Sequence, residues 1–383
     1  MNFELTDDIL KYLKDCEEET LQLTEALCKI PAPSWHEEKR AEFCKNWLTE
    51  NGAEGVIIDE ALNVIYPVGC DDKNDIILFI AHTDTVFPDT EPMPFTRDDE
   101  YMYAPGVGDD TVCVAELMMI ARYVAQNKMK APCGIMFAAN AGEEGLGNLK
   151  GIKHIMETYG KRIKEMYTFD ASYRYVSNKC VGSHRYEITF ETEGGHSFSA
   201  FGNRNAIYAM SDLICKLYQC EVPVVGNSKT TYNVGIVDGG TSVNTIAQKA
   251  TMLYEYRSDT LECLEAMQKF FEDTLEQAKA EGKAEITVNL IGLRPCGGKI
   301  DEAHLAEMTE KVIRISQKHS GIPCVAKSGS TDCNIPMSMG IPAVAAGCYL
   351  GSGAHTREEK VLISSVPVGL KIVAELVLGY FEN

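Results

Sequence analysis

The stretch Ile76 to Asp84, IILFIAHTD, constrains the fold most strongly. Five of its first six residues are large and apolar, which is typical of a parallel strand buried on both faces of an α/β sheet. His82 and Asp84 follow this run, and ligands of open α/β sheets bind beyond the carboxyl ends of the strands. His82 can bind a metal through one ring nitrogen while Asp84 holds the other. The alternative is a strand-end turn with two solvated polar residues.

Further apolar runs deliver acidic or imidazole groups in the same way. Gly134 to Asn140 precedes a pair of glutamates, Met166 to Phe169 precedes an aspartate, and Pro342 to Cys348 is followed by a histidine. An Asp-Asp pair opens a helix predicted over 111–126, which is apolar on most of its surface. Together these positions give the candidate site residues His82, Asp84, Asp109, Glu143, Glu144, Asp170 and His355.

These residue types indicate a metal site with nitrogen and oxygen ligands. Histidine and carboxylate without cysteine suit Zn²⁺, Co²⁺ or Mn²⁺. Five candidate ligands exceed what one tetrahedral zinc needs, and they suit two metals about 3.5–4 Å apart that share a carboxylate and a water. Because Glu143 and Glu144 are adjacent, one can bind metal while the other takes the proton from the water.

The pattern changes in the middle of the chain. A chain of 383 residues is longer than a single hydrophobic core usually accommodates, so two domains are expected. The stretch RYEITFETE alternates polar and apolar residues, and the elements after it follow the order βαββαβ of a ferredoxin-like split arrangement. We therefore predict an α/β domain with a mixed, largely parallel sheet from 1–180 and 294–383. Residues 181–293 form the inserted ferredoxin-like (α+β) domain.

Local signals predict the remaining elements. One helix is expected over 6–29 with Thr6 as its N-cap, and a second over 34–51. Ser34 is expected to cap this second helix, with Glu37 completing a capping box. The segment 88–105, rich in Pro and Asp, is predicted to be a loop.

The net charge and the cysteine pattern limit which partners and which cellular compartment are expected. The net charge of −20 argues against nucleic acid and anionic membrane surfaces as partners. The fourteen cysteines are scattered without a CxxC pair, the N-terminus is unlike a signal peptide, and no apolar run approaches the roughly 20 residues that span a bilayer. We expect a cytoplasmic protein with reduced core cysteines, among them Cys113, Cys215 and Cys348.

Seven segments together resemble a known family: FIAHTDTV, GVGDD, NAGEEGLGN, TFDAS, GGHS, VNTIAQKATMLYEYR and GAHTREE. In this order, which covers essentially the whole chain, they are similar to the M20 metallopeptidases and deacylases. That family includes peptidase T, carboxypeptidase G2, succinyl-diaminopimelate desuccinylase, acetylornithine deacetylase and aminoacylase. The resemblance implies a zinc-exopeptidase-like catalytic domain with an inserted lid and dimerisation domain.

The resemblance also implies roles for the residues that match the family motifs. It implies two divalent metal ions, zinc being expected and cobalt or manganese being alternatives. His82 and Asp170 resemble ligands of one metal, Glu144 and His355 ligands of the other, and Asp109 the bridging aspartate. Asp84 resembles the carboxylate that orients His82, and Glu143 resembles the general base.

Other matching positions resemble groups that contact the substrate. His196 resembles a lid histidine that in dimeric relatives reaches the partner's active site and stabilises the oxyanion; alternatively it is structural. Asn244 and Arg257 resemble substrate-holding groups, or they are strand residues in an ion pair or hydrogen bond. Asp332 lies in a loop that resembles a pocket lining, or it only forms a turn. Thr111 and Val112, and Ser-Phe-Ser-Ala after His196, depart from the commoner family pattern and leave the substrate open.

The predicted function is a metal-dependent hydrolase of amide bonds. The resemblance favours an exopeptidase on short peptides, an aminopeptidase or a di- or tripeptidase, most like peptidase T, acting as a homodimer through the lid domain. An N-acyl-amino-acid deacylase of the same family is the alternative enzyme. A non-catalytic binding protein on the same fold is the alternative of another class.

Overall fold

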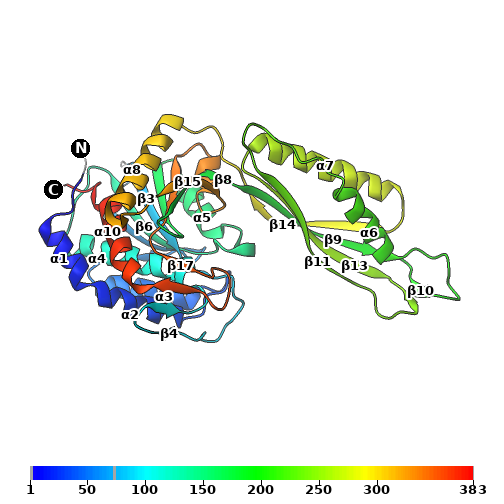
Figure 1. Ribbon diagram of the computed structural model, residues 1–383, viewed down its shortest axis with the longest axis horizontal. Helices are drawn as coiled ribbons and strands as arrows, with labels where there is room; N and C mark the ends of the chain where they lie inside the picture. Colours follow the sequence, from blue (N-terminus) through cyan, green and yellow to red (C-terminus); the bar gives the residue numbers. More distant parts are fainter. Residues whose placement is uncertain (1–2, 72–74, 383) are drawn as a thin grey trace. The chain divides into compact units, whose positions relative to one another are not determined.

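The computed structural model describes residues 3–71 and 75–382, and the chain divides into two compact units (Figure 1). Unit 1 combines Met1–Lys179 with Lys299–Asn383, and unit 2 is the continuous stretch Cys180–Gly298. The segment with the alternating pattern therefore forms a unit of its own, and the polypeptide returns to unit 1 after it.

Unit 1 is built on an eight-stranded sheet with the order β1-β2-β6-β3-β7-β16-β8-β15. Its strands are β1 (Ile57–Ile58), β2 (Val64–Val68), β3 (Ile76–His82), β6 (Gly134–Asn140), β7 (Ile163–Phe169), β8 (Tyr175–Cys180), β15 (Val325–Gly329) and β16 (Ala343–Ala346). The central strands β6, β3, β7 and β16 are parallel, whereas β1, β2 and β8 pair antiparallel with their neighbours. The predicted α/β class with a mixed, largely parallel sheet is confirmed.

The central strands are buried along their whole length, as the unbroken apolar runs predict. Every residue of β3, β6 and β16 is buried. Phe79 at the middle of β3 stacks on Tyr167 and Phe169 of β7, with ring centroids 5.4 and 6.2 Å apart. Because β6, β3, β7 and β16 run in the same direction, their carboxyl ends meet at one edge of the sheet.

Helices cover this sheet. They are α1 (Asp7–Asp15), α2 (Glu17–Cys28), α3 (Glu38–Glu50), α4 (Val112–Gln126), α5 (Lys150–Tyr159), α8 (Glu302–Ser320), α9 (Asn334–Ser338) and α10 (Val366–Leu378). The predicted buried helix is α4, which packs against β3, β6 and β7 and is flanked by α2 and α10. Helix α8 packs against β15, β16 and α10.

The structure corrects three local predictions. The helix expected over 6–29 is two helices that meet at Cys16, although Thr6 does cap the first by accepting the Ile9 N–H. Helix α3 begins at Glu38, and among the described residues no side chain caps it, so the capping box is wrong. The predicted loop contains β4 (Thr96–Arg97) and β5 (Tyr101–Tyr103). These two join β17 (Gly351–Ser352) and β18 (Lys360–Leu362) in a small sheet.

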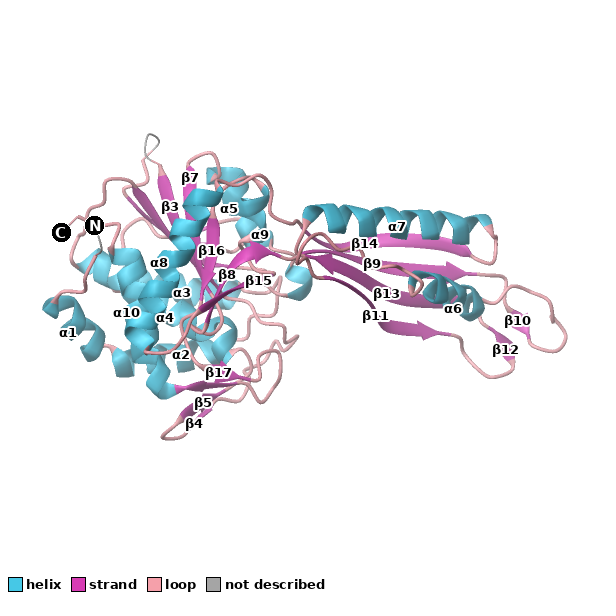
Figure 2. Cartoon of the chain, turned by 45° about the horizontal axis from the view of Figure 1, so that its top comes forward, coloured by secondary structure: helices cyan, strands magenta, loops and turns pink. Residues whose placement is uncertain are grey.

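Unit 2 has the βαββαβ order that the sequence predicts. The elements are β9 (Gly182–Glu191), α6 (Ala206–Leu217), β11 (Thr230–Gly239), β13 (Lys249–Ser258), α7 (Leu261–Ala280) and β14 (Glu285–Arg294). The strands form an antiparallel sheet, β11-β13-β9-β14, which α6 and α7 cover (Figure 2). This is the ferredoxin-like arrangement. The strands β10 (Gly195–His196) and β12 (Thr245–Ile246) pair in a separate small ribbon.

Burial along unit 2 follows the expected periodicity with one exception. Residues of β13 alternate between buried and partly exposed, so the inward side chains form a core with α6 and α7. Cys215, predicted to be a core residue, is exposed. Helix α6 buries Leu213 and Leu217. Cys215 follows Leu213 by two residues, so its side chain lies about 200° away around the helix. Over residues 3–71 and 75–382, none of the helices has the length and apolarity needed to cross a bilayer.

Candidate metal centre

The predicted ligands come together at the carboxyl edge of the parallel strands. His82 is the last residue of β3, Asp170 directly follows β7, and Glu143 and Glu144 lie three and four residues after the end of β6. Asp109 lies in the turn Val107–Thr111 before α4, and its peptide bond to Asp110 is cis. His355 lies in the loop between β17 and β18.

Asp109 lies between the two histidines. Its Oδ1 is 3.0 Å from His82 Nε2, and its Oδ2 is 3.1 Å from His355 Nε2. His355 Nε2 is also 3.3 Å from Glu144 Oε1. Two sets of three donors, His82 with Asp109 and Asp170, and Asp109 with Glu144 and His355, each converge within 4.8 Å. Asp109 belongs to both sets, as a carboxylate shared between two metal ions would.

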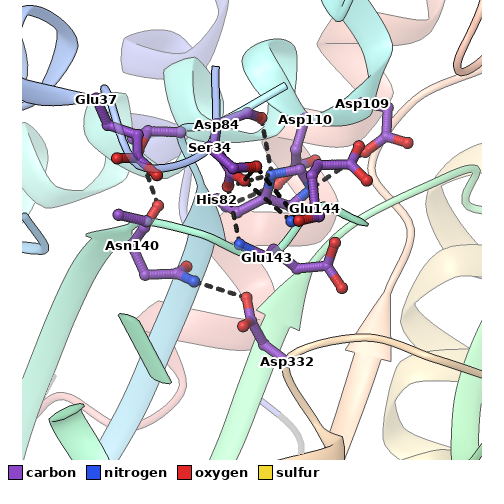
Figure 3. A network of polar contacts seen from close by, with 12 residues as sticks. Ser34, Glu37, His82, Asp84, Asp109, Asp110, Asn140, Glu143, Glu144 and Asp332 are labelled. Atoms are coloured by element: carbon purple, nitrogen blue, oxygen red, sulfur yellow. Dashed lines mark hydrogen bonds and ion pairs between the residues drawn. The ribbon is translucent and has the colours of Figure 1, made fainter. Parts of the chain in front are cut away.

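Asp84 is completely buried, and it supports the residues that carry the metal-binding donors. Its backbone carbonyl is 3.1 Å from His82 Nδ1, and its Oδ1 is 3.5 Å from the same nitrogen. The carboxylate also accepts the backbone N–H groups of Glu143 and Glu144 at 2.9 and 3.0 Å (Figure 3). One aspartate therefore orients the imidazole and fixes the loop that carries both glutamates.

Ser34 completes the surroundings of Asp84. Its hydroxyl donates to Asp84 Oδ2 at 2.6 Å and lies 3.3 Å from the carbonyl oxygen of Glu144 (Figure 3). The capping-box prediction assigned this hydroxyl to a helix terminus. It donates to Asp84 instead, and a hydrogen bond to an ionised carboxylate is stronger than one between neutral groups.

Glu359 is a second supporting residue that the sequence analysis missed. It is buried, and its two oxygens accept the backbone N–H groups of Gly106 at 2.7 Å, Gly108 at 3.0 Å and Asp109 at 2.8 Å. The turn that presents Asp109 is thus held by a residue of the GAHTREE segment. That segment pointed to His355 but gave no local signal for Glu359, whose partners are distant in sequence.

The electrostatics fit a pair of cations. Burial raises the pKa of Glu144 to about 7, helped by the charges of Asp109 and Glu143. Burial also raises the pKa of Asp170 to about 7, with the Asp109 charge adding to the effect. Hydrogen bonds with Asp109 and Glu144 raise the pKa of His355 to about 10. A divalent ion would favour the ionised carboxylates and neutral imidazoles, so this donor set fits two metal ions.

Asp332 also belongs to unit 1, and it is fully buried. Its Oδ2 accepts the side-chain N–H of Asn140 at 2.7 Å, at the carboxyl end of β6 (Figure 3). Burial raises the pKa of Asp332 to about 8, and the charge of Glu143 acts in the same direction. Asp332 is therefore a neighbour of the loop that carries Glu143.

The remaining candidates lie in unit 2. His196 is exposed, and its Nδ1 accepts the backbone N–H groups of Phe198 and Ser199 at 3.2 and 3.5 Å. Asn244 is close to it, because its carbonyl accepts the Ser197 N–H at 2.9 Å. Arg257 lies near the carboxyl end of β13, where its guanidinium donates two hydrogen bonds of 2.9 Å to the Glu255 carboxylate. Within unit 2, His196 and Asn244 are brought together and Arg257 is not.

Comparisons with known proteins identify relatives in sequence and in structure. Succinyl-diaminopimelate desuccinylase of Corynebacterium glutamicum is 24% identical over 359 residues, covering 90% of this chain and 92% of that protein. The crystal structure of aminopeptidase PepT from Bacillus cereus has a TM-score of 0.71 at 21% identity, covering 94% and 98% of the two chains. The Bacillus subtilis YXEP protein, described as a dinuclear metal-binding peptidase, has a TM-score of 0.65 at 16% identity, covering 95% and 98%.

The two structural likenesses establish the fold. The family follows from a different observation, since the model of peptidase family M20/M25/M40 matches residues 78–379. This range begins in β3 and ends just after α10, so it includes every predicted metal ligand. The chain belongs to peptidase family M20/M25/M40 and is a hydrolase of that family.

Proposed function

We propose that this chain is a two-zinc exopeptidase that hydrolyses amide bonds of short peptides, as an aminopeptidase or a di- or tripeptidase. The observation that carries the proposal is the position of Asp109, whose two oxygens face His82 and His355 at 3.0 and 3.1 Å. His82 and Asp170 would hold one ion, Glu144 and His355 the other, and Asp109 both. The relative named as an aminopeptidase favours peptide substrates.

The ions, when bound, polarise the scissile carbonyl and lower the pKa of the attacking water. Glu143 removes the proton from that water and passes it to the leaving amine. Its carboxylate is buried and converges with His82 and Glu144 within 4.8 Å, so it can reach a water held in the centre. Asp84 keeps the His82 ring and the glutamate loop in place through its bonds to both.

The lid, the oligomer and the compartment belong to the same proposal. Residues 1–180 and 294–383 would form the catalytic domain, and residues 181–293 the lid and dimerisation domain. His196, whose Nδ1 is held by its own turn, would stabilise the oxyanion in the active site of a partner subunit. Asn244, Arg257 and Asp332 would contact the substrate. The scattered cysteines support a reducing, cytoplasmic compartment.

Hydrolysis of N-acyl amino acids is the second candidate. The relative named as a desuccinylase favours it, because that name describes cleavage of an acyl group from an amino acid. A non-catalytic binding protein is disfavoured because Glu143 and all the candidate ligands are present together.

The test is hydrolysis of a panel of di- and tripeptides beside N-acetyl and N-succinyl amino acids, with added zinc and with a chelator. We expect chelator-sensitive release of the N-terminal residue from peptides. The variant Glu143→Ala should retain both metal ions, measured by elemental analysis, and lose activity. A near-normal rate in that variant would remove Glu143 as the base, and cleavage of the acylated compounds alone would favour the deacylase.

Oligomeric state tests the lid. Size-exclusion chromatography with light scattering should give a dimer, and mixing inactive Glu143→Ala with inactive His196→Ala protein should restore activity in heterodimers. A fully active monomer would rule out His196 acting across an interface.

A further inference from the structure

Trp35 is an exposed aromatic residue held in a strained conformation. Its side chain is 57% exposed, and its φ of 76° lies in the left-handed region, which is unusual for a bulky residue. The conformation is fixed on both sides. The Trp35 N–H donates to Glu37 Oε1 at 3.1 Å, and the His36 N–H donates to the Pro33 carbonyl at 2.8 Å. Backbone strain of this kind gathers at ligand-binding sites.

The indole ring of Trp35 is tied to the loop after β6. Its Nε1 donates to the carbonyl of Leu146 at 3.0 Å, and the Leu146 side chain is itself 55% exposed. Lys150 Nζ lies 4.9 Å from the centre of the indole and 2.7 Å from Glu37 Oε2, so an ion-paired ammonium fixes the ring. Trp35 and Leu146 are thus two exposed apolar residues joined by a hydrogen bond, and we call this pair the Trp35–Leu146 ledge.

The ledge is built on one loop that supports the candidate centre and one that carries two of its glutamates. Ser34, next to Trp35, bonds Asp84 and approaches the carbonyl of Glu144. Leu146 follows Glu144 by two residues, and the Glu144 carboxylate faces His355. All these residues belong to unit 1. The ledge therefore includes a residue of the loop that carries Glu143 and Glu144, two positions after a candidate ligand.

We propose that the Trp35–Leu146 ledge is a substrate subsite that receives a large apolar or aromatic side chain of the residue next to the scissile amide. The inference rests on the proposed peptidase function and adds the substrate class: short peptides with Leu, Met or Phe at that position. Contact with a side chain would remove apolar area of the ledge from water, which favours binding of such peptides over those with Ala or Gly.

The first test compares peptides that differ in one side chain. Phe-Gly, Leu-Gly, Ala-Gly, Gly-Phe and Gly-Ala are assayed with the zinc-loaded wild-type protein, Trp35→Ala, Leu146→Ala and the control Leu10→Ala, an exposed leucine of α1. For one of the two positions we expect kcat/KM to favour the large side chain by about tenfold or more. Each ledge variant should lose most of this preference while rates on the Ala peptides stay within about twofold.

A second readout does not need turnover. The chain has two tryptophans, so Trp47→Phe leaves Trp35 as the sole emitter, and Glu143→Gln in the same protein prevents hydrolysis. Titration with the preferred Phe dipeptide should shift Trp35 emission to shorter wavelength, and the matching Ala dipeptide should shift it less.

The outcomes separate the two proposals. Equal kcat/KM for Phe and Ala peptides in the wild-type protein, or equal loss on both in Trp35→Ala, would overturn the subsite, as would identical emission with both dipeptides. If no peptide is hydrolysed in a chelator-sensitive way, the peptidase proposal fails. The fluorescence titration then still decides whether the ledge binds a large apolar side chain.

Discussion

Glu359 accepts the backbone N–H of Asp109 at 2.8 Å across 250 residues of sequence. The same carboxylate accepts the N–H groups of Gly106 and Gly108, so it fixes the turn that leads into the shared aspartate. A Cβ at Gly108 would lie 2.8 Å from Glu359 Oε1, which indicates how closely the carboxylate packs on this turn. Asp109 therefore depends on Glu359 for its position.

Replacing Glu359 should weaken metal binding. In Glu359→Gln one oxygen becomes an NH₂ group that cannot accept an N–H, so the turn shifts and Asp109 with it. Loss of a residue that orients a ligand typically costs 10–100-fold in metal affinity, and we expect a weakening of about that size. Isothermal titration with zinc measures it. Glu358→Gln, which changes an exposed neighbour, is the matched control, and equal affinities in the two variants would contradict the positioning role.

Removing the Ser34 hydroxyl should destabilise the fold. Asp84 keeps its two backbone N–H donors in Ser34→Ala but loses the hydrogen bond of 2.6 Å. A hydrogen bond to a charged group contributes about 1.5–3 kcal/mol, so we expect unfolding free energy to fall by about that amount. Denaturant titration measures it, and Ser199→Ala, in an exposed loop of unit 2, should change little. A Ser34→Ala protein as stable as wild type would show that the hydroxyl is dispensable.

Metal ions should stabilise the fold as well as serve the reaction. The folded chain gathers the donors and the unfolded chain does not, so zinc at a hundredfold excess over its Kd should add about 2.7 kcal/mol. Thermal unfolding with zinc and with a chelator gives the shift in Tm. Asp109→Asn should abolish most of the shift, because Asp109 belongs to both donor sets. Asp99→Asn, at an exposed position, should keep it; a zinc effect unchanged in Asp109→Asn would contradict the shared ligand.

Lys311 provides a pH-dependent prediction. Burial lowers its pKa from 10.5 to about 8, while its Nζ lies 4.0 Å from the centre of the Tyr380 ring. Below pH 8 both the folded and unfolded chains hold the proton, and the full cost of burying the ammonium is present. Between about pH 8 and 10.5 the folded state releases the proton first, so this cost declines and stability rises with pH.

Lys311→Met should therefore raise the unfolding free energy at pH 7 by about 1 kcal/mol, a figure reduced for partial exposure and for the lost contact with the Tyr380 ring. The gain should shrink at pH 9.5. Urea unfolding at the two pH values measures both, with the exposed Lys39→Met as control. A gain that is the same at both pH values would contradict the assigned cause.

Much of the candidate site could be predicted because its information is local to each strand. A buried run that ends in His82 or Asp170 marks both the strand and the edge at which it stops, and parallel strands bring these ends together. The order of elements in unit 2 was equally accessible, because alternation of period two and helical periodicity are visible within single segments.

The residues that support the candidate ligands could not be predicted, because their partners are distant in sequence. Ser34 and Glu37 have the spacing of a capping box, and only the fold reveals that Asp84 accepts the hydroxyl instead. Glu359 follows Arg357 and Glu358 in a charged stretch, and its three partners lie about 250 residues away. The junction at Cys16 has a similar origin. The two helices that it separates pack on different combinations of α4 and α10, which the periodicity of residues 6–29 does not encode.

The order of strands in unit 1 has a consequence for biosynthesis. Strand β16 lies between β7 and β8 in the sheet, yet the ribosome adds it only after all of unit 2 has been made. Strands β7 and β8 must therefore wait, without their shared neighbour, while more than a hundred residues emerge. A nascent chain that stops before Ala343 already contains His82, Asp109 and Asp170 but cannot close the sheet on which they depend, so this hydrolase should acquire its activity only when translation is nearly complete.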